Sequence, residues 1–134
     1  MFMIYQRIIS KAQVDAVNKN PESSLAKAHF GLLFPNEDNA QECVNAALNV
    51  GIYQKTMLIG ATDGLSVTLE QVFNAGNGYP GEGVNVVSMG RHASMSVGDI
   101  AVSLLDDDVY LCMPHGWHVL DMELSLEPAS YKCD

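Results

Sequence analysis

Basic residues are scarce in this chain of 134 residues, which has seven Lys plus Arg against 16 Asp plus Glu and a formal net charge of −9. An excess of acid of this size opposes binding to nucleic-acid phosphates and to anionic lipid. Long apolar runs are lacking too, since none approaches the roughly 18 residues that a membrane-spanning helix requires. We therefore expect neither a direct nucleic-acid partner nor a membrane partner.

Cysteine is also scarce, and its placement does not favour disulfides. Cys43, Cys112 and Cys133 form an odd number at wide spacing, so reduced thiols are the expected state. The opening residues, Met1 to Arg7, lack the basic-then-apolar order of a secretory signal. These features predict a cytoplasmic protein.

The composition is otherwise that of a globular protein. Hydrophobic residues make up 48% of the chain, which is enough to bury a core without disulfides or metals. The length fits a single domain over residues 1–134. Residues 61–134 hold two basic and 11 acidic residues and so carry all of the net charge.

The first third of the chain predicts a strand followed by two helices. Met1–Ile9 mixes aromatic and branched residues, as strands do. Ser10 and Gln13 form a capping box, which predicts a helix to about Asn20. Asn20-Pro21 then has the residue types of a cap and a first helical turn, and predicts a second, short helix before Pro35.

Two further helices are predicted by spacing. Apolar residues recur at one helical face before Gly51, and Asp38 with Gln41 is placed to cap that helix; the face consists of Ala40, Cys43, Val44, Ala47 and Leu48. Ser66 or Thr68 is placed to cap a helix that ends at Gly76. A glycine-rich loop is expected from Gly76 to Asn85, because its G-x-G-x-x-G pattern follows a helix and lacks the strand-to-helix context of a nucleotide site.

Strand patterns dominate the rest of the chain. Met57–Ile59 is a short strand candidate, and four more follow at Val86–Val87, Asp99–Leu105, Val109–Met113 and Trp117–Leu120. We predict an α+β fold with helices mostly N-terminal and a small, curled antiparallel sheet mostly C-terminal, arranged as an SH3-like roll or a meander. The first strand is expected to join that sheet.

Cys112, His115 and His118 form a C-x2-H-x2-H pattern, and imidazole with thiolate is a ligand set that suits zinc. A structural site needs a fourth ligand, for which His92, Asp121 and Cys133 are candidates. The same spacing arises in ordinary hairpins, with Cys112 inward, His115 in a turn and His118 on the solvent face. We prefer the hairpin interpretation and predict no cofactor, with zinc as the alternative.

No catalytic residues are predicted. His92, Ser94, Ser96 and Asp99 supply the residue types of a hydrolytic triad, but a triad must converge across a fold rather than lie within one short segment. Residues 94–98 are better explained as a turn that leads into a strand, with Ser96 or Asp99 bonding local backbone amides. The chain is therefore expected not to be an enzyme.

Two features are candidates for partner binding. Asp106, Asp107 and Asp108 are predicted to form a solvated hairpin tip, available to a basic partner. Trp117, the only tryptophan, has the area of a core or interface anchor, and a core role is preferred.

The last third of the chain resembles the YodL-like small proteins of bacteriophages and mobile elements. The resemblance is carried by the S-x-S-V-G-D segment with the preceding arginine, the Y-x-C segment and the G-W pair, which here are Arg91–Val102, Val109–Cys112 and Gly116-Trp117. It implies a phage or mobile-element origin, a bacterial host cell and a compact helical-plus-β fold. It implies no family-wide enzymatic activity.

These observations lead to one hypothesis and one alternative. The hypothesis is a non-enzymatic accessory protein, an anti-defence candidate, that binds a host or phage protein with a basic surface through its acidic half. Mimicry of DNA is a narrower form of it, and a homo-oligomer is compatible with it. The alternative is a small metal- or ligand-binding domain that uses Cys112, His115 and His118.

Overall fold

The computed structural model of the protein describes residues 1–90 and 93–124. These residues form helices and strands in the following order: β1 (Phe2–Arg7), α1 (Lys11–Lys19), α2 (Ser24–Gly31), α3 (Ala40–Val50), β2 (Tyr53–Ala61), α4 (Leu69–Gly76), β3 (Val84–Ser88), β4 (Ile100–Ser103), β5 (Val109–Cys112) and β6 (Trp117–Leu120). The predicted α+β class is confirmed. The helices lie mostly in the N-terminal part of the chain, as predicted, but they are interleaved with strands, since β1 precedes α1 and β2 lies between α3 and α4. Within the described residues, no helix is long and apolar enough to cross a membrane.

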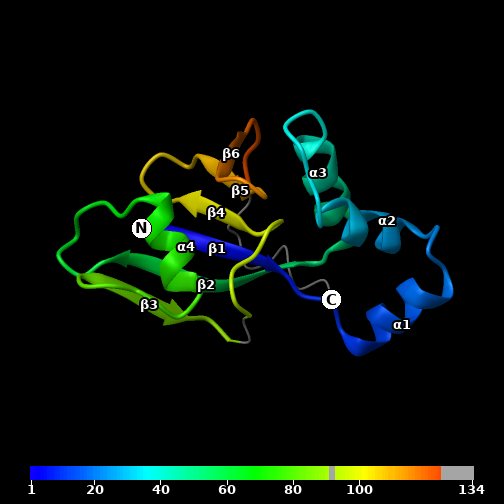
Figure 1. Ribbon diagram of the computed structural model, residues 1–134, viewed down its shortest axis with the longest axis horizontal. Helices are drawn as coiled ribbons and strands as arrows, with labels where there is room; N and C mark the ends of the chain where they lie inside the picture. The colour runs from blue at the N-terminus through cyan, green and yellow to red at the C-terminus, as the bar shows by residue number, and fades with distance from the viewer. Residues whose placement is uncertain (91–92, 125–134) are drawn as a thin grey trace.

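All six strands of the described residues belong to one antiparallel sheet with the order β3-β2-β1-β4-β5-β6 (Figure 1). The first strand joins the sheet, as predicted, and occupies an inner position between β2 and β4. Strands β4, β5 and β6 form the expected meander of consecutive hairpins. The strand predicted at Met57–Ile59 is longer than its apolar centre and covers nine residues.

The helices cover opposite faces of opposite halves of this sheet. Helices α2 and α3 pack on the half formed by β1, β4, β5 and β6, around a core that includes Leu32, Val44, Ile100 and Leu111. Helix α4 packs on β2 and β3 across the other face, where Val72 contacts a second core. The offset leaves each half of the sheet with one face that no helix of the described residues covers.

Local sequence signals fix most helix ends. Ser10 caps α1 and Thr68 caps α4, and each forms the complete capping box with the glutamine three residues on. Gly51 ends α3 in the left-handed conformation, with φ of +75°. These positions were predicted because each cap is satisfied by neighbours in the sequence.

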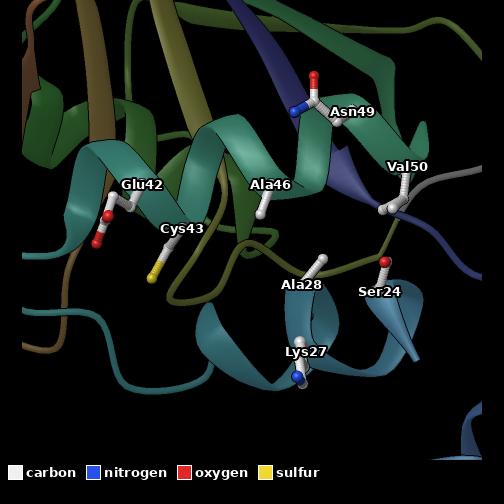
Figure 2. A pocket seen from close by; sticks show the side chains of 8 residues that line it. All are labelled: Ser24, Lys27, Ala28, Glu42, Cys43, Ala46, Asn49 and Val50. Atoms are coloured by element: carbon white, nitrogen blue, oxygen red, sulfur yellow. The ribbon is translucent and has the colours of Figure 1, made fainter. Parts of the chain in front are cut away.

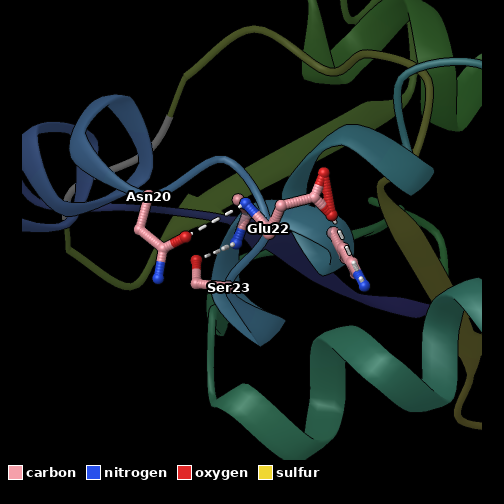
Figure 3. Close-up of polar contacts among 5 residues, drawn as sticks. Asn20, Glu22 and Ser23 are labelled. Carbon is pink, nitrogen blue, oxygen red and sulfur yellow. Dashed lines mark hydrogen bonds and ion pairs between the residues drawn. The ribbon is translucent and has the colours of Figure 1, made fainter.

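The predicted start of the second helix was wrong. Asn20 ends α1, and its side chain accepts a hydrogen bond from the Glu22 amide at 3.3 Å (Figure 3). The second helix begins after Ser23, whose hydroxyl accepts from the Ala26 amide at 3.1 Å. An asparagine side chain can close a turn as readily as it caps a helix, and here the turn is preferred.

The third helix also starts differently from the prediction, which paired Asp38 with Gln41. Its N-cap is Asn39, and no side chain caps it. The Asn39 side chain instead accepts a hydrogen bond from the Asn36 amide at 2.9 Å. The predicted apolar face of this helix is nevertheless confirmed, since Ala40, Val44 and Ala47 are buried in the core.

Candidate functional site

The three consecutive aspartates lie at the tip of the β4–β5 hairpin and are exposed. The Asp107 amide donates to the Ser103 carbonyl at 2.9 Å, and the Asp108 amide donates to Asp106 Oδ1 at 3.0 Å. Asp107 has φ of +64°, the only positive value among the non-glycine residues that the structure describes. The predicted hairpin tip is confirmed, and the Tyr110 phenol donates a side-chain hydrogen bond to the Asp108 carboxylate, which joins the tip to the next strand.

Exposed leucines accompany these carboxylates. Leu105 is 84% exposed and Leu104 is 37% exposed, although both follow directly after a fully buried strand. We call residues 104–108 the acidic turn. It combines exposed apolar area with three like charges at one end of the sheet.

An aromatic face adjoins the acidic turn. Tyr110 pairs with Val119 and Cys112 pairs with Trp117, so strand alternation places these four side chains on the same side of the β5–β6 hairpin. Tyr110 and Trp117 are partly buried against the core under α4, whereas Val119 is 56% exposed. We call Tyr110, Trp117 and Val119 the aromatic face.

The acidic turn acts electrostatically on this face. Desolvation raises the pKa of the Tyr110 phenol above its ordinary value, and the charges of Asp108 and Asp106 raise it further. Carboxylates and an aromatic ring therefore lie close enough to present one combined surface. Trp117 is neither a fully buried core residue nor a fully exposed anchor, and it connects this surface to the core.

The structure separates the residues of the C-x2-H-x2-H pattern. Cys112 pairs with Trp117 while His118 pairs with Leu111, so the two side chains lie on opposite faces of the hairpin. His115 is exposed in the connecting turn. Burial, with a smaller contribution from Asp99, raises the pKa of the Cys112 thiol to about 11, which keeps it protonated and a poor ligand.

No group of three His, Cys, Asp or Glu side chains in the described residues is placed to hold a metal ion. Of the candidates for a fourth ligand, Asp121 is exposed after β6, whereas His92 and Cys133 lie outside the described residues. The hairpin interpretation therefore fits the geometry of Cys112, His115 and His118, and the metal alternative does not.

Asp99 belongs to a buried polar cluster rather than to a triad. Its Oδ2 accepts the Ser96 amide at 2.9 Å and Gln6 Nε2 at 3.1 Å, which confirms the predicted local turn. Burial raises the pKa of this carboxyl, and the hydrogen bonds and the nearby Arg7 charge offset part of that shift. Gln6 also bonds both backbone groups of Ala93, so it holds the segment before the turn against β1.

Arg7 and Tyr53 complete this cluster from the ends of β1 and β2. The Arg7 guanidinium donates to the carbonyls of Val97 at 2.9 Å and His29 at 3.4 Å, and the Tyr53 hydroxyl donates to the Gly98 carbonyl at 2.6 Å. These contacts join the sheet, the turn before β4 and the end of α2. Each contact therefore stabilises the fold. Sequence reasoning missed Gln6, Arg7 and Tyr53 because their partners are 22 to 93 positions away.

A shallow groove of about 400 Å³ lies between α2 and α3 (Figure 2). Its floor is made largely of small side chains, including Ala28 and Ala46, and its rim carries Lys27 and Glu42. Burial raises the pKa of the Cys43 thiol at one end, so this sulfur is not an activated nucleophile. The groove has no convergent set of polar groups that would define a ligand.

Comparisons with protein-family models, with curated proteins and with solved structures find no match to this chain. The class of the protein is therefore described from its fold and its surface alone. The described residues form a small α+β unit whose buried polar side chains hydrogen-bond within the fold. The acidic turn is exposed, and the aromatic face is partly exposed.

The Gly98 position gives a sharp test of the buried cluster. Gly98 has φ of +95°, and a Cβ there would lie 2.8 Å from Arg7 Nε and 2.8 Å from the Leu32 carbonyl. We expect Gly98→Ala to cost about 3–5 kcal/mol, since overpacking adds to left-handed strain. Gly51→Ala, at a similar φ of +75° but with nothing within 4 Å, should cost only about 1–2 kcal/mol. Equal losses in urea denaturation would contradict the close packing.

The His29 imidazole predicts a pH dependence of stability. Burial and the Arg7 charge lower the pKa of this group below its ordinary value of 6.5, and its Nδ1 is buried without a hydrogen-bond partner in the described residues. Folding therefore favours the neutral ring, so its contribution is present above about pH 6.5 and is lost as the pH falls through the lowered value. Compared with His29→Gln, the wild type should lose more thermal stability between about pH 7 and 5. Parallel curves would refute this.

Trp117 is expected to contribute less than a fully buried tryptophan. Because the ring is partly exposed on an edge strand, Trp117→Ala should cost roughly 1–3 kcal/mol rather than the 3–5 kcal/mol of a core position. Val119→Ala, on the same face and 56% exposed, should change the free energy of unfolding by less than about 0.5 kcal/mol. A loss above about 4 kcal/mol for Trp117→Ala would show that it is a core residue.

Proposed function

We propose that this protein is a non-enzymatic accessory protein that binds another protein with a basic surface through the acidic turn and the adjoining aromatic face. The resemblance noted above adds a phage or mobile-element origin and a host or defence factor as the partner. The observation that supports binding through this surface is the combination at residues 104–108 of exposed carboxylates with a leucine that is 84% exposed.

Charge supports this choice of partner. A net charge of −9 steers a basic surface toward the protein, and the carboxylates of Asp106, Asp107 and Asp108 concentrate part of that charge at one tip. Electrostatic complementarity of this kind mainly increases the association rate, whereas apolar and aromatic contacts determine how slowly the complex dissociates. Leu105, Trp117 and Val119 are the exposed or partly exposed side chains that would supply those contacts.

The proposal is tested by replacing the three aspartates with asparagine. Asp106→Asn retains the Oδ1 acceptor that binds the Asp108 amide, and asparagine tolerates the left-handed backbone at position 107. The triple variant should therefore remain as stable as the wild type or become slightly more stable. A basic partner should associate with it about tenfold more slowly at low salt, and its binding should depend less on salt.

A matched control separates local from overall charge. Asp15→Asn, Glu37→Gln and Glu82→Gln remove the same number of charges from three dispersed, exposed positions. Bacterial proteins captured at low and at high salt by the wild type, the tip variant and this dispersed variant are compared by quantitative mass spectrometry. We expect a basic protein that the wild type and the dispersed variant capture and the tip variant does not. Equal capture by all three would refute a role for the acidic turn.

A further inference from the structure

Strand β3 forms one edge of the sheet, at the bottom of Figure 1. Thr62 donates to the Gly83 carbonyl and Met89 donates to the Thr56 carbonyl, so the odd-numbered residues of this strand bond to β2. The amides and carbonyls of Val84, Val86 and Ser88 consequently point away from the sheet. No residue that the structure describes accepts from or donates to these backbone groups.

Within residues 1–90 and 93–124, this edge lacks the charges, prolines and bulges that usually block strand addition. The segment Val84–Gly90 contains no charged residue and no proline, and the β2–β3 register runs without a bulge. Apolar side chains are exposed along it: Val87 is 55% exposed and Met89 48%. On the other face, α4 and the loop after it add Phe73 at 38% and Tyr79 at 77%.

We propose that β3 pairs with β3 of a second copy of this chain, which forms a twofold-symmetric dimer with a continuous sheet across the interface. With Val86 on the twofold axis, Val86 of each copy donates a hydrogen bond to Val86 of the other and accepts one from it. Val84 of each copy then pairs with Ser88 of the other. Every outward backbone group of the strand is then satisfied. Val87 lies beside the axis, where its exposed apolar area is reduced.

Charge favours a second copy at this edge. A protein with a net charge of −9 repels itself, so self-association requires a contact region without charge, and β3 provides one. The β4–β5 tip lies three to four strands away from this edge, which places the two acidic turns about 40 Å apart in the dimer. That separation is about five times the screening length of roughly 8 Å at physiological salt.

The opposite edge of the sheet is a poorer choice for the same contact. In β6, the Met113 amide donates to the Gly116 carbonyl, so the even-numbered residues, His118 and Leu120, bond to β5. Only the backbone groups of Trp117 and Val119 in this strand point outward. Pairing there would bring the acidic turns to about 20 Å. The amide just beyond β6, that of Asp121, is already bonded to Gln41 on α3.

Two matched substitutions test the proposal by sedimentation equilibrium. Val87 and Val119 are 55% and 56% exposed on opposite edges, so Val87→Lys and Val119→Lys make the same change at sites of equal exposure. The wild type and Val119→Lys should dimerise with a dissociation constant of about 10–100 µM, in keeping with a small interface. Val87→Lys should raise that constant at least about tenfold, because it places two ammonium groups beside the axis.

A second variant removes hydrogen bonds without changing charge. The Ser88 amide points away from β2, so Ser88→Pro leaves the pairing within the sheet intact while it deletes two bonds of the dimer. Circular dichroism should show both β3 variants folded, and both should be monomeric at concentrations where the wild type is a dimer.

Amide exchange in the wild type supplies an independent readout. Raising the protein concentration should slow exchange at Val84, Val86 and Ser88, while Asn85 and Val87 are protected by β2 at every concentration. A wild type that stays monomeric at about 500 µM would overturn the proposal, since such an affinity is below that of specific dimers. Loss of the dimer in Val119→Lys but not in Val87→Lys would overturn it as well.

Discussion

The structure depends on the inner strand β1, which is hydrogen-bonded to β2 on one side and to β4 on the other. The last residues of this strand extend its influence beyond the sheet. Gln6 binds Asp99 and the segment before β4, and the Arg7 guanidinium binds backbone carbonyls of Val97 and His29. Because buried polar groups are costly when unpaired, these contacts define one arrangement of strand, turn and helix. Gly98 is required at their centre, since a side chain there would overlap Arg7.

This buried cluster explains why the chain has titratable and nucleophilic residues without a reacting centre in the part that the structure describes. Asp99 is occupied by amides, the Tyr53 hydroxyl by a carbonyl, and the Cys112 thiol is held protonated by its surroundings. The carboxylates of the acidic turn, in contrast, are exposed at the end of a buried strand.

The offset packing of helices on the sheet also places the two candidate surfaces. Helices α2 and α3 cover one face of β4 to β6, which leaves Tyr110 and Val119 on the other face at the end of the hairpin near the acidic turn, and Trp117 at its far end. Helix α4 covers the other face near β3, whose edge remains open. A charged surface and an uncharged edge therefore lie on opposite sides of the molecule.

The sequence by itself determined several local features: the Ser10 capping box, the glycine that ends α3, the acidic hairpin tip and the turn before β4. It left two alternatives for the cap of α4, Ser66 or Thr68, and two for the side chain that closes the turn, Ser96 or Asp99; the structure selects Thr68 and Asp99. The hydrogen bonds of each feature join residues a few positions apart, so a short sequence pattern is enough to predict it. Tertiary structure decided the strand order, the faces that the helices cover and the role of Arg7, and the pairing register put Cys112 and His118 on opposite faces. Those outcomes depend on burying apolar faces and pairing polar groups far apart in the chain, for which no local spacing is a signal.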